Sequence, residues 1–192
     1  MNSTREVYLN GKLIGAVPMS GHDKLDQERV VQLLKDKGLY RETTAIQAIY
    51  RQAISFATTS SYLYHRDLVK VPRNGLSVAP FVVNSAFAIE LYIKTLGKIF
   101  NTPLHGHDLL ELFDALPEEA HSALQQHFSK ARWPSEISTL ENYRKAIEQM
   151  RNAFVEWRYV HENQEANEIQ IPPMIFVMEV LHETCNSCQE YS

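Results

Sequence analysis

The sequence predicts an all-α protein, a helical bundle of four to five main helices with a small β-hairpin near its N-terminus. Three observations support this prediction. Several segments repeat apolar residues at helical spacing, one segment is apolar on nearly every side, and an Asn-Gly pair separates two short β-favouring runs. The hydrophobic share of 44% and the charged share of 22% are those of an ordinary globular chain.

The composition limits the kinds of partner and compartment. The formal net charge is −4, so contact with a nucleic acid would require a local basic cluster. No apolar run reaches the roughly 18 residues that cross a bilayer, and the first residues lack the apolar core of a secretion signal. The two cysteines, Cys185 and Cys188, offer no disulfide framework. We therefore expect a cytoplasmic protein that makes no membrane contact.

The N-terminal hairpin is expected over residues 7–15. Its turn is Asn10-Gly11, a pair that tolerates the positive φ angles of a type I′ turn. A two-stranded hairpin is only marginally stable alone, so it must pack on helical residues that follow. The first short helix is expected directly after it, with Asp23 as a possible N-cap and Gly38 just past the last turn.

The chain is expected to divide after this short helix. Residues 1–42 hold the hairpin and the first helix, and residues 43–192 form the bundle as one compact unit. Thr44 and Gln47 have the spacing of a capping box, which predicts the start of a long helix.

The next helix should lie in the middle of the bundle. Pro80 suits its first position, and the residues that follow are apolar almost all round. Glu90 is an exception within this segment. A carboxylate buried there needs a partner, so we expect Glu90 to hold a structural one.

The second half of the chain predicts further helices. Asp108 can cap a short helix, and Pro117 can start another that runs to about Lys130. The longest helix is expected over about residues 135–162. A closing helix is expected after Pro172.

The expected long helix carries an apolar seam and a line of arginines. Arg144, Arg151 and Arg158 are seven residues apart and lie along one flank of the seam. The seam itself follows alternating steps of three and four: Leu140, Tyr143, Ile147, Met150, Phe154, Trp157 and His161.

One interpretation of these arginines is structural. Glu148 follows Arg144 by four residues and Glu162 follows Arg158 by four, a spacing at which weak ion pairs form on a helix. Alternatively, an arginine can reach Glu90. Breaking such a buried pair would cost roughly 3–5 kcal/mol.

Three segments together resemble the HEPN superfamily: "NSAFAIELYIK" (84–94), "GHDLLELFDAL" (106–116) and "MRNAFVEWRYVHE" (150–162). The resemblance covers roughly residues 43–191 and includes the helix order. It implies a four- or five-helix bundle, commonly a homodimer, of the kind found in prokaryotic toxin–antitoxin and defence systems. Many such proteins are metal-independent ribonucleases.

The motif of that family is an arginine, a polar residue, and a histidine separated from the arginine by four to six residues. Arg151 and Asn152 match its first half. The second half fails, because the three positions at that spacing hold Glu156, Trp157 and Arg158. Because the motif is incomplete, a degenerate module that does not cleave RNA is an interpretation of equal weight to a nuclease.

A shifted register offers a substitute for the missing histidine. His161 is three residues past Arg158, so both side chains share one helix face. The resemblance implies that the histidine handles protons during attack of the ribose 2′-hydroxyl, and that the arginine stabilises charge on the phosphate. On this interpretation Arg151, Asn152, Arg158 and His161 are the candidate catalytic residues, with Arg144 as a substrate-binding residue.

Two loop histidines are weaker candidates for substrate binding. His105 and His107 flank a glycine ahead of a helix start, and with His161 they can form a metal or acid–base cluster if the fold gathers them. Their alternative interpretation is that they are solvated loop residues beside the cap Asp108. The C-terminal Cys-x-x-Cys lacks a second ligand pair, and no phosphate loop occurs, so we expect no metal and no cofactor.

Two main functions remain open, beside an enzyme of another chemistry at His105, His107 and His161. The first is a HEPN-like homodimer that binds RNA or a nucleotide and is a candidate metal-independent endoribonuclease, although its motif is incomplete. The alternative is a non-catalytic dimerisation or protein-interaction bundle, in which the arginines form structural ion pairs.

Overall fold

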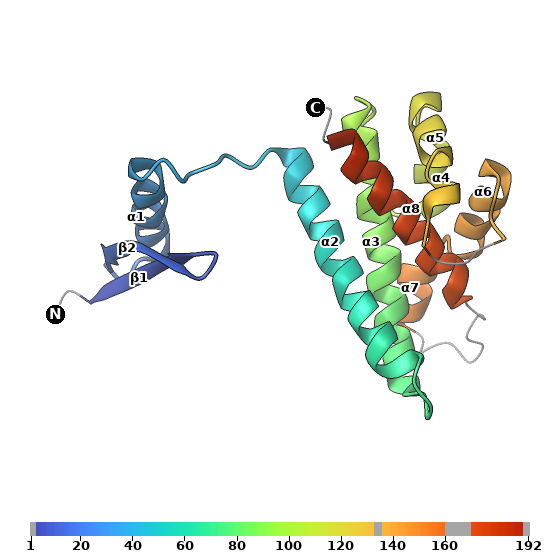
Figure 1. The fold of residues 1–192 in the computed structure, drawn as a ribbon, viewed down its shortest axis with the longest axis horizontal. Helices are drawn as coiled ribbons and strands as arrows, with labels where there is room; N and C mark the ends of the chain where they lie inside the picture. The colour runs from blue at the N-terminus through green and yellow to red at the C-terminus, as the bar shows by residue number, and fades with distance from the viewer. Residues whose placement is uncertain (1–2, 133–135, 160–169, 190–192) are drawn as a thin grey trace. The chain divides into compact units, whose positions relative to one another are not determined.

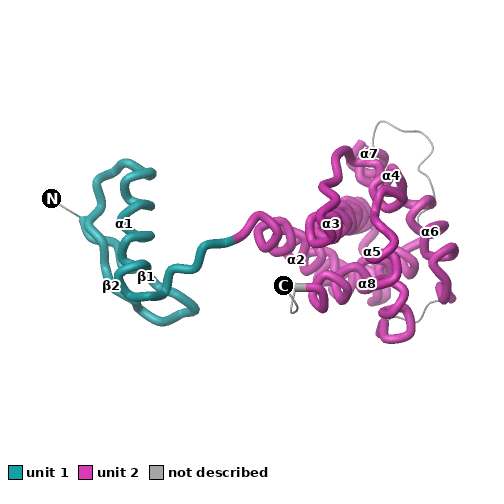
Figure 2. Tube along the Cα trace, turned by 90° about the horizontal axis from the view of Figure 1, so that it is seen from above, with its two compact units in different colours: residues 1–43 teal, residues 44–192 magenta. Residues whose placement is uncertain are grey.

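The computed structural model describes residues 3–132, 136–159 and 170–189. Contacts between Cα atoms divide the chain into two compact units, residues 1–43 and residues 44–192 (Figure 2). The fold class is confirmed: the protein is mainly an α-helical bundle, and its N-terminal unit carries a two-stranded antiparallel hairpin.

The hairpin consists of β1 (Thr4–Leu9) and β2 (Lys12–Pro18). Asn10 and Gly11 form its turn with φ angles of 51° and 76°, as the type I′ prediction requires. A register shift between Val7 and Tyr8 interrupts the pairing.

Helix α1 (Asp23–Asp36) follows the hairpin. Its N-cap is His22, one residue before the predicted Asp23. The buried side chain of Asp26 fixes the preceding loop, because its carboxylate accepts hydrogen bonds from the Ser20 N–H at 2.7 Å and the Ser20 hydroxyl at 2.8 Å. These bonds lower the pKa of Asp26. Its charged carboxylate therefore holds the loop against the first turn of the helix.

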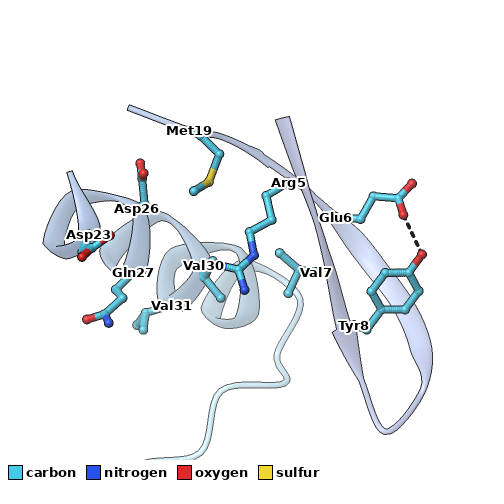
Figure 3. A pocket seen from close by; sticks show the side chains of 10 residues that line it. All are labelled: Arg5, Glu6, Val7, Tyr8, Met19, Asp23, Asp26, Gln27, Val30 and Val31. Carbon is cyan, nitrogen blue, oxygen red and sulfur yellow. Dashed lines mark hydrogen bonds between the residues drawn. The ribbon is translucent and has the colours of Figure 1, made fainter. Parts of the chain in front are cut away.

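The apolar core of the N-terminal unit is small. Among residues 3–43 the buried apolar side chains are Val7 and Val17. A cleft of about 580 Å³ lies between β1 and α1 (Figure 3). In it Arg5 extends from the strand toward Val30 of α1, whereas Glu6 lies on the other side with Tyr8. Packing in this unit therefore depends on few apolar contacts.

The bundle begins with α2 (Ala45–Leu63), whose N-terminus carries the capping box predicted for Thr44 and Gln47. A π-helical turn (Tyr64–Leu68) and a 3-10 turn (Gly75–Ser77) lead to α3 (Val78–Ile99). Because the 3-10 turn runs directly into α3, Pro80 is the third residue of the helix and not the first.

Helix α3 lies at the centre of the bundle, with α2 along one side and α8 (Ile171–Gln189) against another (Figure 1). Thirteen of its residues are buried, including Phe81, Val82, Ile89 and Leu96. By length and composition alone, Gly75–Ile99 is the one helical segment of the described chain that can cross a membrane. However, 61% of its most apolar window is buried in the bundle, as in the core helix of a globular protein.

Shorter helices complete the bundle: α4 (Leu109–Asp114), α5 (Glu118–Gln125), α6 (Leu140–Gln149) and α7 (Ala153–Arg158). Helices α4 and α7 pack on α3, and α6 packs on α4 and α8. Tyr143, Ile147 and Met150 of the predicted apolar seam are buried.

The single long helix predicted over residues 135–162 is wrong. The chain turns between α6 and α7, where Met150 has φ −108° and ψ 11°. The Arg151 carbonyl accepts a hydrogen bond from the Leu109 N–H at 3.5 Å, and the Val155 N–H donates instead to the Asn152 carbonyl at 3.0 Å. A contact from a distant segment thus replaces the helical hydrogen bond at this point. The expected continuation to residue 162 lies outside the described residues.

Candidate functional site

Two of the three arginines hold the two ends of α4. The Arg144 guanidinium donates from Nε and Nη2 to the two carboxylate oxygens of Asp114, at 2.7 and 2.6 Å. Seven residues later, Arg151 Nε donates to Asp108 Oδ2 at 2.7 Å, and its Nη2 lies 3.6 Å from Glu111 Oε1. Arg144 and Arg151 therefore face acidic residues at and within α4, whereas Arg158 does not.

The carboxylate of Asp108 has two roles. Its Oδ1 accepts hydrogen bonds from the Leu110 N–H at 3.0 Å and the Glu111 N–H at 3.1 Å, which is the N-cap predicted for α4. Its Oδ2 is bound by Arg151. Burial alone would raise the pKa of Asp108, but the backbone hydrogen bond from Glu111 and the bond from Arg151 outweigh it and lower the pKa.

Glu90 is buried, as expected, but its partners are not the predicted arginines. Lys94 Nζ donates to Glu90 Oε1 at 2.7 Å, from the next turn of α3. His107 Nδ1 lies 3.0 Å from the same oxygen. The other oxygen, Oε2, has no hydrogen-bond partner in the described part of the chain. A buried oxygen without a hydrogen-bond partner lowers the stability of the folded state, so Oε2 of Glu90 is destabilising in the core.

The contact between Glu90 and His107 joins a buried carboxylate to an exposed imidazole. The side chain of Glu90 is 2% exposed and that of His107 is 73% exposed. A carboxylate only accepts hydrogen bonds, so Nδ1 of His107 carries the hydrogen that Glu90 receives. In the neutral ring the lone pair is then on Nε2, where it can accept a proton. This is the arrangement of an oriented general base.

The sequence of the loop connects this dyad to Arg151. His107 binds Glu90, and the next residue, Asp108, binds Arg151. Two sets of contacts are thus adjacent in the chain: Glu90 with Lys94 and His107, and Asp108 with Arg151. We call these five residues the His107 cluster. Lys94 and Asp108 are members that the sequence had not suggested for a site. The i, i+4 spacing of Glu90 and Lys94 was the available signal for the first.

The remaining predicted site residues lie apart from these contacts. Asn152 is exposed at the turn before α7, and its carbonyl accepts from the N–H groups of Val155 and Glu156, both at 3.0 Å. His105 is exposed in the loop before α4. His161 lies outside the described residues, so the shifted pair that it would form with Arg158 stays a prediction.

Arg158 stands on an aromatic surface at the end of α7. Its guanidinium carbon is 5.5 Å from the centre of the Phe154 ring and 4.6 Å from that of Tyr159, and Nη2 donates to the Tyr159 hydroxyl. The side chains of Arg158 and Tyr159 are exposed. Such a surface offers a cation and an aromatic face together.

Within residues 3–132, 136–159 and 170–189, no group of three or more His, Cys, Asp or Glu side chains is arranged to hold a metal ion. Comparisons of the chain with protein-family models, curated proteins and solved structures found no match. The fold therefore defines the class of protein: a mainly α-helical bundle with an N-terminal β-hairpin unit, carrying a histidine oriented by a buried carboxylate.

Proposed function

We propose that the bundle is a HEPN-like module that binds RNA and cleaves it at the His107 cluster. The observation that carries the proposal is the buried Glu90 carboxylate 3.0 Å from Nδ1 of the exposed His107. Burying a carboxylate costs free energy of desolvation, and a function in acid–base chemistry accounts for its position beside an exposed imidazole. The choice of RNA as substrate rests on the resemblance of the sequence to the HEPN superfamily.

In this proposal His107 takes the proton-handling role that the family motif would give to a later histidine. Nε2 accepts the proton of the ribose 2′-hydroxyl as its oxygen attacks the adjacent phosphorus. The bond from phosphorus to the 5′-oxygen breaks, which leaves a 2′,3′-cyclic phosphate, and the departing 5′-oxygen takes a proton from water. Glu90 holds the ring in the required tautomer and stabilises the imidazolium that forms. The guanidinium of Arg151, whose side chain is 40% exposed, donates to the phosphate oxygens as negative charge develops.

Arg158 would contribute to binding and not to the chemical step. An exposed guanidinium stacked on aromatic rings suits a nucleotide, since it pairs with phosphate while the exposed Tyr159 ring can stack on a base. Nε and Nη2 of Arg144 are both bound by Asp114, so we assign this residue the stabilisation of α4. A homodimer and a role in prokaryotic defence or a toxin–antitoxin system are further expectations that the resemblance carries.

The second candidate is a non-catalytic bundle that dimerises or binds another protein. The ion pairs of Arg144 with Asp114 and of Arg151 with Asp108 favour it, because both guanidinium groups already bind carboxylates of the same chain. In this case the arginines only stabilise the packing of α4 on α6.

Labelled single-stranded RNA separates the two candidates when it is incubated with the full chain at low salt, with EDTA present. The wild type should bind and cleave, His107→Ala and Glu90→Gln should bind without cleavage, and Arg151→Ala should weaken binding. Lys145→Ala removes an exposed cation of α6 that pairs with Glu141, and it should behave as the wild type. Absence of RNA binding at low salt would reject the first candidate. In that case the Arg144→Ala and Arg151→Ala substitutions should lower only the stability of the protein, as the second candidate predicts.

A further inference from the structure

A groove in the helical bundle lies between α2 and α8, over α3. Its volume is about 640 Å³. Phe81 and Tyr92 of α3 line it and are buried, as is Met178 of α8, while Ile54 and Ala57 of α2 are partly buried at its side. Binding sites for small molecules are mostly apolar and measure roughly 300–1,000 Å³, so the groove has the size and the lining of such a site.

The length of the groove follows from the spacing of its lining residues. Phe81 and Tyr92 are eleven residues apart on α3, which places them about 16 Å apart along the helix axis.

Polar side chains also line the groove, among them Arg132, Glu179 and His182. Nδ1 of His182 lies 3.1 Å from the Tyr92 hydroxyl and 3.4 Å from the Tyr50 hydroxyl. Desolvation raises the pKa of Tyr92 far above its ordinary value, so its hydroxyl keeps its hydrogen at neutral pH. His182 and Tyr92 both line the groove, so they offer a hydroxyl and an imidazole to a polar group of a ligand.

We propose that this groove binds a small amphipathic molecule. Its aromatic or branched aliphatic body lies over Phe81 and Met178, and its one hydrogen-bonding group lies at His182 and Tyr92. The site is separate from the His107 cluster, because Glu90 and Tyr92 are two residues apart on α3 and project about 160° apart around the helix. The proposal therefore does not depend on RNA binding.

The test uses the full chain and the fluorescent probe 8-anilinonaphthalene-1-sulfonate, an aromatic amphiphile. The wild type should enhance its fluorescence saturably with one site per chain. Ala57→Trp fills the side of the groove and should abolish this binding, and Thr58→Trp, at an exposed lining position, should weaken it. Ala48→Trp is the matched control, since Ala48 is exposed on the same helix and does not line the groove.

Circular dichroism and thermal melting establish that each variant is folded. Thr58→Trp replaces an exposed residue, so it provides the test if Ala57→Trp does not fold. The proposal is overturned if the wild type shows no saturable binding, or if the folded groove variants bind as the Ala48→Trp control does. It is also overturned if raising the protein concentration doubles the molecular mass and displaces the probe, because a second copy of the chain then occupies the groove.

Discussion

The guanidinium of Arg151 and the carboxylate of Asp108 meet at 2.7 Å, although 43 residues separate them in the chain. A backbone contact joins the same two segments, since the N–H of Leu109, the residue after Asp108, donates to the carbonyl of Arg151 at 3.5 Å. Two hydrogen bonds therefore hold the start of α4 against the turn between α6 and α7. His107 lies directly before this point in the chain.

We expect Asp108→Ala to destabilise the protein more than Asp114→Ala. Asp108 caps α4 and pairs with Arg151, whereas Asp114 only forms an exposed ion pair with Arg144. The first substitution should lower the free energy of unfolding by about 1–3 kcal/mol and the second by less than about 1 kcal/mol. Urea titration at pH 7 measures both. Equal losses would mean that the cap contributes nothing.

The ionisation of Asp108 should make the free energy of unfolding depend on pH. Its pKa is lower in the folded protein than in the unfolded chain, so the folded state binds this proton less tightly. The stabilisation is complete above the unfolded pKa of about 3.9 and is lost as the pH falls through the lower, folded pKa.

Asp108→Asn isolates this effect, because asparagine is also a good N-cap. The difference in urea midpoint between wild type and variant should be largest near pH 7 and should shrink below about pH 4. A difference that stays constant down to pH 2 would contradict the assigned pKa direction.

Gly97 should not tolerate a side chain. A Cβ atom there would lie 2.5 Å from the Thr102 carbonyl oxygen and 2.8 Å from Leu104 Cγ. Gly97→Ala forces the chain after α3 away from the helix and should cost about 1–3 kcal/mol. Gly75→Ala is the matched control, since nothing lies within 4 Å of its Cβ. Thermal melting of the two variants compares them, and similar melting temperatures would show that the loop yields easily.

The two cysteines should differ sharply in reactivity. Cys185 is fully buried, and burial raises the pKa of its thiol well above the ordinary range. Cys188 is only partly buried, and burial raises its pKa as well. An aromatic disulfide reagent should therefore modify one thiol slowly in the native protein and the second only after unfolding. Cys188→Ser should remove the native-state reaction, and a persistent fast reaction in that variant would disprove the burial of Cys185.

Features that depend on neighbouring residues could be predicted from the sequence. The Asn10-Gly11 turn, the capping box of Thr44 and the cap Asp108 all follow from local hydrogen bonding, and all three are confirmed. The central position of α3 in the bundle also follows from its composition, since it is apolar almost all round. Helix type and approximate position were therefore accessible, with errors of one or two residues at Asp23 and Pro80.

Features set by distant segments could not be predicted. The apolar seam continues unbroken through Met150, so nothing in the spacing signals the turn that Leu109 stabilises from another helix. Arg144 has Glu148 at a suitable spacing, yet it binds Asp114, which lies 30 residues away. Glu90 was identified as a residue that needs a partner, but its contact with His107 depends on how the loop folds back onto α3.

The scarcity of apolar packing in residues 3–43 affects how the whole protein denatures. Val7 and Val17 are the buried apolar side chains described there, against more than twenty-five in the bundle. Few apolar contacts therefore oppose local opening of the hairpin and α1. We expect the amides of residues 3–43 to exchange their hydrogens faster than those of the bundle core.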